Sequence, residues 1–280
     1  MKNLVMIVAA LGLGACQPDT RNIEKKLDEL NKKIDNLSAR GGVGGPGAAA
    51  PRAQRPQPDA AKTYAVPIEG DAFEGPADAK VTIVKAYDYA CPFCERVRDT
   101  MDQIRQKYPN DVRIVYKQFV VHPTVATAGA LAFCAAGKHG KAIEMDKLLW
   151  DKSFKTHNFD KDQAQGHGCW DSAEGCPVVL GYAQELGLDQ TQFKNDMKEC
   201  VGIAKKDQTE LAQLGVGATP SFFINGRFIS GAVPIENFTA VIEEELKKAN
   251  EKISAGTPAA QYYQQWVVDK GQKTLDAPKQ

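Results

Sequence analysis

One short segment constrains this chain more than any other. A β-branched, apolar run, Val81 to Tyr87, leads into Cys91-Pro92-Phe93-Cys94. The run predicts a buried strand, and a helical stretch from about Cys94 to Lys107 follows. A cysteine at a helix N-terminus meets unpaired backbone N–H groups and the positive end of the helix dipole, which favour its thiolate. The arrangement predicts that Cys91 is a redox nucleophile and that Cys94, one turn further along, is the resolving thiol.

A CxxC motif can also bind a metal or form a merely structural bridge. Zinc binding would need a second CxxC or a HxxxH partner at ordinary spacing, and the sequence has neither. We therefore expect no metal and no cofactor here beyond the redox-active disulfide of Cys91 and Cys94. A structural bridge remains the alternative.

Charge and composition narrow the class of partner. The chain has 280 residues, with 35 Lys and Arg against 35 Asp and Glu. Phosphate binding requires a basic excess, so we expect no nucleic-acid partner. Hydrophobic residues make up 43 % of the chain, which is enough for at least one real core.

The N-terminus is typical of an export signal. Lys2 precedes an apolar run, Leu4 to Leu13, which is shorter than the about 20 residues that cross a bilayer. The run ends in Leu13-Gly14-Ala15-Cys16, which resembles the lipobox of bacterial lipoproteins. We expect residues 1–15 to be removed and Cys16 to be lipidated, anchoring the protein to a membrane of the bacterial envelope and facing the periplasm. Gln17 favours the outer membrane over the inner; an ordinary secretory signal is the alternative.

A helix and a linker are predicted after Cys16. Heptad spacing of apolar residues predicts a short coiled-coil helix in residues 16–40 that could join copies of the chain through residues 21–37; these residues are Ile23, Leu27, Leu30, Ile34 and Leu37. The alternative is a single amphipathic helix lying on its own body or on lipid. Residues 41–62 are rich in Gly, Ala and Pro, which predicts a flexible linker of at most roughly 75 Å.

A second motif lies in the C-terminal part of the chain. Ser221 to Ile224 and Arg227 to Ser230 flank Asn225-Gly226, a sequence typical of a type I′ hairpin turn, and Thr219-Pro220 precedes the first strand. Together with the CPFC segment, these residues resemble the DsbA-like thiol-disulfide oxidoreductases of the thioredoxin superfamily. The resemblance covers about residues 68–251.

The resemblance implies an α/β architecture. A thioredoxin fold would occupy residues 63–254, with a helical subdomain inserted at about 123–214, and residues 255–280 would form a C-terminal tail. It also implies that Pro220 is cis and faces the CxxC motif, and that the backbone of Thr219 pairs with a substrate chain. The tail's aromatic residues would pack on the body rather than bind a partner.

One position departs from the family. Six residues before the first cysteine the family commonly carries a buried Glu that is thought to relay the proton of the inner thiol, whereas this chain has Lys85. A buried ammonium favours a neighbouring thiolate, and desolvation lowers its own pKa. We therefore expect Lys85 to act as a proton relay. The alternative is that its side chain extends to solvent.

The insertion carries the remaining four cysteines. Helices are expected at residues 125–136, 142–152, 178–186 and 190–214, and His122-Pro123 would open the first rather than take part in catalysis. A bridge from Cys134 to Cys200 would clamp the insertion, as a structural disulfide does in some DsbA-like enzymes, and Cys169 with Cys176 would close a loop. Four cysteines allow three connectivities, and the sequence leaves them open. A zinc site with His157 and His167 is a weaker alternative because the spacing is unusual.

The resemblance implies exchange of the Cys91–Cys94 disulfide with the cysteines of unfolded or exported proteins. The DsbA-like features favour an oxidase that promotes disulfide formation and is recycled by a membrane redox partner. The same residues could serve a reductase or isomerase of the envelope. A lipoprotein that binds partners with its redox pair idle is the third possibility.

Overall fold

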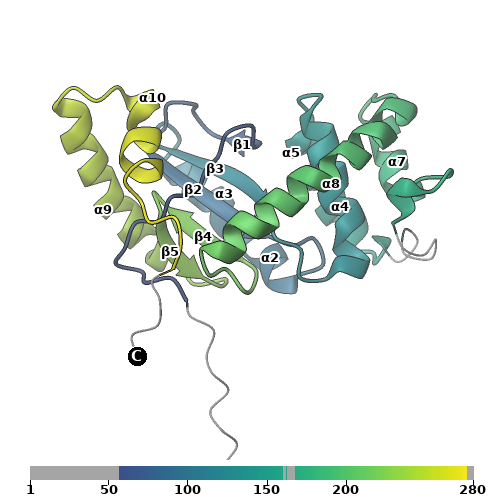
Figure 1. The fold of residues 1–280 in the computed structure, drawn as a ribbon, viewed down its shortest axis with the longest axis horizontal. Helices are drawn as coiled ribbons and strands as arrows, with labels where there is room; N and C mark the ends of the chain where they lie inside the picture. The colour runs from purple at the N-terminus through teal and green to yellow at the C-terminus, as the bar shows by residue number, and fades with distance from the viewer. Residues whose placement is uncertain (1–56, 160–161, 163–167, 276–280) are drawn as a thin grey trace, which may run out of the picture. The chain divides into compact units, whose positions relative to one another are not determined.

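The computed structural model describes residues 57–159, 162 and 168–275. Five strands form one sheet in the order β1-β3-β2-β4-β5 (Figure 1). The central pair β2 and β3 is parallel, and the other neighbours are antiparallel. The strands are β1 (Phe73–Glu74), β2 (Val81–Tyr87), β3 (Val112–Gln118), β4 (Ser221–Ile224) and β5 (Arg227–Ser230).

β2 lies at the centre of the sheet and is buried along its whole length. Its alternate side chains enter two cores, because successive residues of a strand point to opposite faces. Ile83 and Tyr87 belong to the larger core, together with Met101, Ile104 and residues of the insertion, while Val84 and Ala86 belong to the smaller one. Lys85 therefore shares the face of the larger core.

Helices cover both faces of the sheet. The single helix expected at residues 94–107 is two helices in the structure, divided at Val97, which is the C-cap of the first and the N-cap of the second. The helices and short helical turns are α2 (Pro92–Arg96), α3 (Arg98–Lys107), α4 (Pro123–Gly137), α5 (Ala142–Leu148), η1 (Leu149–Phe154), η2 (Cys169–Asp171), α7 (Pro177–Glu185), α8 (Gln190–Gln213), α9 (Ile235–Ser254), α10 (Ala259–Tyr262) and η3 (Tyr263–Val268).

The segment between β3 and β4 forms the helical insertion. In Figure 1 its helices α4, α5 and α7 lie to the right of the sheet, and the long helix α8 runs back from them across it. α4 packs against α5, α7 and α8. The predicted fold class, a thioredoxin-like α/β fold with a helical insertion, is confirmed.

The two ends of the described chain are joined to each other and to the hairpin. Tyr64 N–H donates to the carbonyl of Gly226 at 2.8 Å, and Ala65 N–H donates to that of Gln272 at 2.8 Å. Within residues 255–275, α10 and η3 bury Tyr262 and Tyr263 in the smaller core, so these aromatic residues pack on the fold. None of the helices in the described part is long and apolar enough to cross a membrane.

The predictions for the first 56 residues lie outside the described part of the chain. They are the signal peptide, the lipidated Cys16, the heptad helix and most of the linker. They stay predictions.

Candidate redox site

The site is built where β2 passes into α2. Cys91 is the N-cap residue of α2, with extended backbone angles, and its carbonyl accepts hydrogen bonds from Cys94 N–H at 3.0 Å and Glu95 N–H at 3.2 Å. Pro92 occupies the first turn without losing a hydrogen bond. Cys91 is 4 % exposed and Cys94 is fully buried, whereas the ring of Phe93 between them is half-exposed. The helix start thus leaves a small part of Cys91 exposed and holds Cys94 fully buried.

The loop before β4 lies directly against the first thiol. The Thr219–Pro220 peptide bond is cis. Cys91 Sγ lies 3.2 Å from the carbonyl oxygen of Thr219, which accepts a hydrogen bond from Cys91 when that thiol is protonated. The structure therefore brings together the residues of the two motifs, Cys91, Cys94, Thr219 and Pro220, that are far apart in the sequence.

Asp88 fixes the loop that precedes Cys91. Its carboxylate is fully buried and accepts hydrogen bonds from the N–H groups of Ala90, Val121 and His122, at 2.6, 2.6 and 2.8 Å. These bonds tie the loop to the start of α4. His122 lies with Nδ1 3.3 Å from Asp88 Oδ2, and its imidazole is half-exposed. The residue opens α4, as expected, and the sequence analysis did not identify its partner Asp88.

The two thiols differ strongly in acidity. Hydrogen bonds from the Cys94 thiol and from the backbone N–H groups of Phe93 and Cys94 lower the pKa of Cys91 to about 5. Burial, and the hydrogen bond to Cys91, raise the pKa of Cys94 far above its ordinary value. At neutral pH the reduced pair is therefore a thiolate at Cys91 beside a neutral thiol at Cys94.

Lys85 is buried beneath this pair. It is only 2 % exposed, and its Nζ lies over the rings of Tyr87 and Tyr116, 4.7 and 5.2 Å from their centroids. Its side chain does not extend to solvent. Burial lowers the pKa of Lys85, and the charges of Asp146 and Cys94 oppose that shift.

Asp146 of α5 supplies the charge that faces Lys85. Its Oδ1 accepts hydrogen bonds from Tyr89 Oη at 2.8 Å and from Trp150 Nε1 at 3.1 Å. Burial raises the pKa of this carboxyl, and Lys85 is the largest influence in the opposite direction. The role of Asp146 was not predicted from the sequence. The pattern that indicates it is weak: an acidic residue on the apolar face of a helix, four residues before Trp150.

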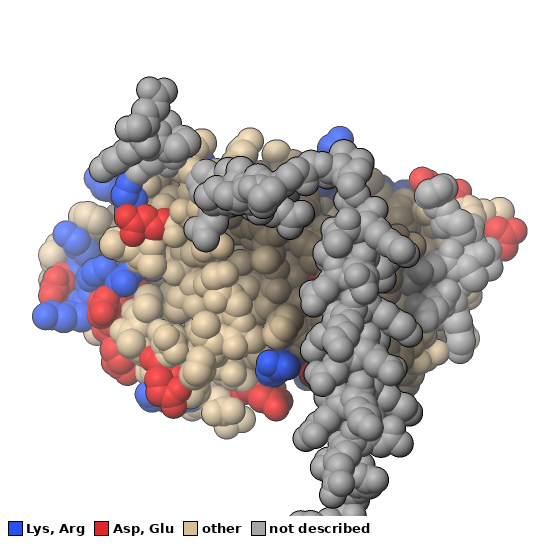
Figure 2. Space-filling view, turned by 90° about the horizontal axis from the view of Figure 1, so that it is seen from below, with Lys and Arg blue, Asp and Glu red and all other residues tan. Residues whose placement is uncertain are grey.

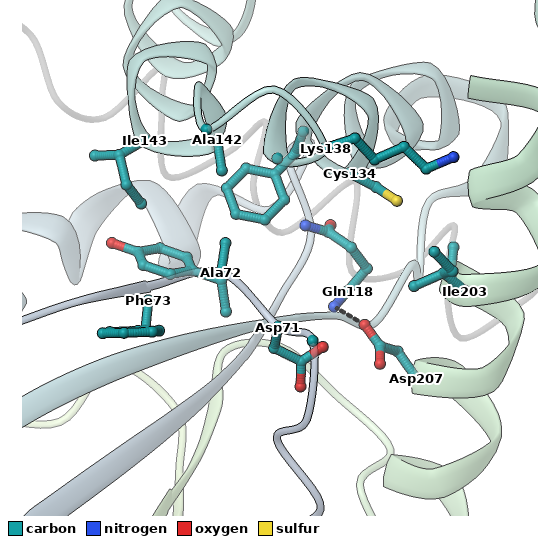
Figure 3. A pocket seen from close by; sticks show the side chains of 16 residues that line it. Asp71, Ala72, Phe73, Gln118, Cys134, Lys138, Ala142, Ile143, Ile203 and Asp207 are labelled. Atoms are coloured by element: carbon teal, nitrogen blue, oxygen red, sulfur yellow. Dashed lines mark hydrogen bonds between the residues drawn. The ribbon is translucent and has the colours of Figure 1, made fainter. Parts of the chain in front are cut away.

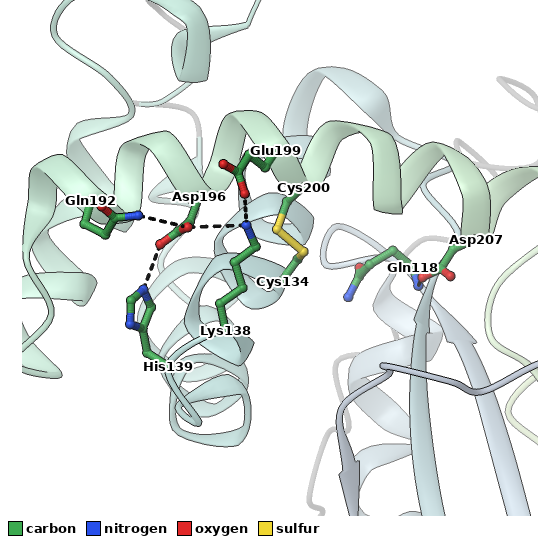
Figure 4. Close-up of a disulfide and its surroundings, with 9 residues drawn as sticks. All are labelled: Gln118, Cys134, Lys138, His139, Gln192, Asp196, Glu199, Cys200 and Asp207. Carbon is green, nitrogen blue, oxygen red and sulfur yellow. Dashed lines mark hydrogen bonds and ion pairs between the residues drawn. A yellow bond between two sulfur atoms is a disulfide. The ribbon is translucent and has the colours of Figure 1, made fainter.

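Two disulfides hold the insertion. Cys134 on α4 is bonded to Cys200 on α8, and Cys169 is bonded to Cys176 at the start of α7. Figure 4 shows ion pairs beside the first bridge, where Lys138 contacts Asp196 and Glu199, and His139 Nε2 lies 2.7 Å from Asp196 Oδ2. Of the three pairings possible for these four cysteines, the structure contains Cys134–Cys200 with Cys169–Cys176.

No group of three or more metal-binding side chains occurs among the described residues. His157 lies within that part and His167 outside it. Cys169 and Cys176 are occupied by their mutual bond, so they do not offer free thiolates.

Comparison with known proteins agrees with this geometry. A family model described as thioredoxin matches residues 68–244. A Na(+)/H(+) antiporter NhaA of Herminiimonas arsenicoxydans is 29 % identical over 177 residues, which are 62 % of this chain and 25 % of the antiporter. NhaA 1 of Salinispora arenicola is 31 % identical over 186 residues, 63 % of this chain and 25 % of that protein. The chain thus spans about a quarter of the length of these relatives.

Among solved structures, α-DsbA1 of Wolbachia pipientis has the same fold. The TM-score is 0.53 at 18 % sequence identity, and the match covers 67 % of this chain and 96 % of the other. The matched family model covers more than half of the chain and includes the CPFC segment and the cis-proline loop. The chain belongs to the thioredoxin family.

Proposed function

We propose that this protein is a thiol-disulfide oxidoreductase that donates its Cys91–Cys94 disulfide to cysteines of exported proteins. The observation that carries the proposal is the unequal acidity of the two thiols. A pKa of about 5 at Cys91 makes it a stable thiolate, and this favours the reduced form of the enzyme. A disulfide whose reduced form is stabilised is an oxidant, so the direction favoured is disulfide formation in the substrate.

The exchange proceeds in two displacements. A substrate thiolate attacks Cys91 Sγ, the Cys91–Cys94 bond breaks, and Cys94 Sγ takes the electron pair and a proton. The second substrate thiolate then attacks the substrate sulfur of the mixed disulfide, and Cys91 leaves as a thiolate. The substrate is oxidised by two electrons, and the enzyme is reduced by two. A membrane redox partner would restore the enzyme disulfide.

We assign the proton of Cys94 to Lys85. The charge of its ammonium lowers the pKa of the Cys94 thiol, whereas burial raises that pKa. Burial lowers the pKa of Lys85, and the charge of Asp146 is the largest influence that opposes this shift. Cys94 can therefore leave as an anion and take its proton from Lys85.

The surface near α2 suits varied substrates. α2 lies at the lower edge of the molecule in Figure 1, and Figure 2 views that side. The middle of this face shows few charged side chains, while Lys, Arg, Asp and Glu gather toward α9. The exposed ring of Phe93 stands next to Cys91. The guanidinium of Arg96 lies 5.1 Å from the centroid of this ring, and an exposed aromatic ring of this kind can contact unfolded chains of many sequences.

The export signal and the lipid anchor at Cys16 belong to the same proposal. They rest on the sequence alone and would place the enzyme in the periplasm, held to the outer membrane. Ion transport is not proposed for this chain, because the match to the antiporters covers only a quarter of their length.

The reduction potential of the Cys91/Cys94 pair tests the direction of exchange. Equilibration with glutathione should give a value near about −120 mV, as for strong oxidants, and a value near about −270 mV would indicate a reductant instead. Alkylating Cys91 should abolish capture of reduced, unfolded substrates. Capture that persists after alkylation would indicate a binding protein with an idle redox pair.

A further inference from the structure

A cavity of about 380 Å³ lies away from the redox cysteines, between the sheet and the insertion (Figure 3). Neither Cys91 nor Cys94 lines it. Its walls come from the segment around β1, from β3 and from the helices α4, α5 and α8, and most of them are apolar: Ala72, Phe73, Phe133, Ile143, Ile203 and Ala204. The volume falls within the range of small-molecule sites, about 300–1,000 Å³.

One buried polar atom in this cavity has no partner. Gln118 is 4 % exposed, and its Oε1 accepts no hydrogen bond from any described residue. In Figure 3 the amide of Gln118 stands amid the lining side chains, beneath Lys138 and Cys134. A buried carbonyl oxygen without a donor is unusual in proteins, and it indicates that a donor is to be supplied from elsewhere.

The hydrogen-bond network fixes which end of the Gln118 amide faces the cavity. Trp150 Nε1, which can only donate, bonds to Asp146 Oδ1, so that oxygen is an acceptor and Tyr89 donates to it as well. Tyr89 then accepts from Tyr87, whose oxygen lies 3.0 Å away. Tyr87 in turn accepts from Gln118 Nε2 at 2.6 Å. One N–H of the NH₂ group thus donates to Tyr87, and Oε1 is the amide atom that is left without a partner.

The charges around the cavity are predominantly negative. Asp71 and Asp207 line it and share one ammonium, that of Lys117, at 2.9 and 2.7 Å, and Glu210 lies 3.3 Å from the same nitrogen. Lys138 also lines the cavity, but its ammonium is paired with Asp196 and Glu199 (Figure 4). The unpartnered Gln118 atom that is left to a ligand is therefore an acceptor, next to an excess of carboxylates.

We propose that this cavity binds a small organic cation, an ammonium or guanidinium group on an apolar stem. The cationic group donates a hydrogen bond to Gln118 Oε1 and lies in the field of Asp71 and Asp207. The stem packs among Phe133, Ile203 and the ring of Tyr116, where aromatic faces also attract a cation. An anion would meet the carboxylates, and a purely apolar molecule would leave Gln118 Oε1 unpaired.

Three probes of similar size separate these possibilities: 2-phenylethylammonium, the neutral 2-phenylethanol and the anionic 3-phenylpropionate. Each is titrated into the full-length protein and followed by calorimetry and ligand-observed NMR. The ammonium should bind at least about tenfold more tightly than the alcohol, because charge-assisted hydrogen bonds are the stronger ones. The propionate should not bind measurably. Equal affinity for the three probes, or no binding of the ammonium, overturns the proposal.

Variants locate the binding. Gln118→Met removes the unpaired oxygen at similar side-chain size and should lower the affinity for 2-phenylethylammonium about fivefold. Ala204→Phe fills the cavity and should abolish binding of this probe. Asp71→Asn should weaken it about tenfold. Glu210→Gln is the matched control, since it removes a carboxylate from the same Lys117 but does not line the cavity, and it should change the affinity by about twofold or less.

The result does not depend on thiol chemistry. Circular dichroism shows whether each variant is folded, and if Ala204→Phe fails to fold, Gln118→Met and Asp71→Asn still decide. Undiminished binding in both of these variants places the cation elsewhere and contradicts the proposal. The affinity is measured with Cys91 and Cys94 oxidised, so a failure of the proposed redox function leaves this test intact.

Discussion

The sheet and the helical insertion contribute to the redox site in different ways. β2 and α2 place the two thiols through a short, local motif, in which strand, turn and helix start follow one another within a few residues. The insertion reaches the same site from a distance, by placing Asp146 of α5 opposite Lys85 of β2. The comparison teaches that the nucleophile is a product of local sequence, whereas its electrostatic surroundings are a product of tertiary packing.

The strongest test of this division removes the local part. Cys91→Ser should reduce disulfide exchange with a reduced peptide dithiol by at least about a thousandfold, because no other described thiol is free and near the surface. With an oxidised peptide as substrate, Cys94→Ser should instead accumulate the mixed disulfide: Cys91 attacks the peptide disulfide and releases one peptide thiol, and no Cys94 thiol is present to displace the peptide; non-reducing electrophoresis detects this species. Replacing Cys169 and Cys176 together with Ala serves as the control and should preserve exchange. Substantial activity in Cys91→Ser would show that the motif is not the reactive centre.

The next test breaks the contact between the two regions. Asp146→Leu leaves the buried Lys85 without its opposing charge and should lower the free energy of unfolding by about 3–5 kcal/mol. Combining it with Lys85→Met should cost less than the sum of the single changes, because the unpaired charge is then absent. Denaturant unfolding measures these differences. Asp151→Asn, in an exposed ion pair with Arg98, should cost at most about 1 kcal/mol. Additive effects of the two buried changes would mean that the charges are not coupled.

The insertion can also be loosened without touching the site. The Cys134–Cys200 bridge joins residues 66 positions apart, and the Cys169–Cys176 bridge joins residues 7 apart. By the chain-entropy relation, their removal should cost about 4 and about 2 kcal/mol of stability. Paired Cys→Ala variants and thermal unfolding test this order. A larger loss from the shorter bridge would show that local strain, not loop closure, governs the insertion.

A pH dependence is also expected in the stability of the reduced protein. The pKa of Cys91 is lowered to about 5, below the ordinary value of about 8.5, so its thiolate stabilises the reduced fold fully above pH 8.5. That contribution is lost as the pH falls from about 8.5 to about 5. The Tm of the reduced protein should therefore rise with pH relative to the oxidised protein, which lacks the titrating thiol. A constant difference over this range would contradict the thiolate at Cys91.

The pH dependence of Cys94 tests the contribution of Lys85. With Lys85→Met the pKa of Cys94 should rise further, since the neighbouring ammonium lowers it. Lys85→Glu should change the pH profile of the exchange rate between about pH 5 and 9, and an unchanged profile would remove Lys85 from the proton transfer. Lys147→Met, a neighbour of Asp146 on the solvent side of α5, is a suitable control.

The sequence predicted most of what local patterns determine. The strand Val81–Tyr87, the hairpin at Asn225-Gly226 and the long helices of the insertion follow from periodicity and turn chemistry. The break between α2 and α3 at Val97 was missed, because nothing in the composition around it interrupts a helix. Asp88, Asp146 and Gln118 were also missed. Their importance lies in contacts with residues 30 to 60 positions away, and single-sequence patterns do not encode such contacts.

The join between the chain's two described ends has a mechanical consequence. Tyr64 is hydrogen-bonded to Gly226, at the turn of the hairpin, while Cys91 Sγ contacts the carbonyl of Thr219 near the opposite end of β4. β4 has four residues, so the two ends are separated by roughly 13 Å. A pull on the N-terminal segment would therefore be carried by the backbone bonds among Thr63, Tyr64, Gly226 and Gln272. The segment that carries Cys91 and Cys94 would not bear this force, so a pull on the N-terminal segment would leave the redox site in place for a substrate chain.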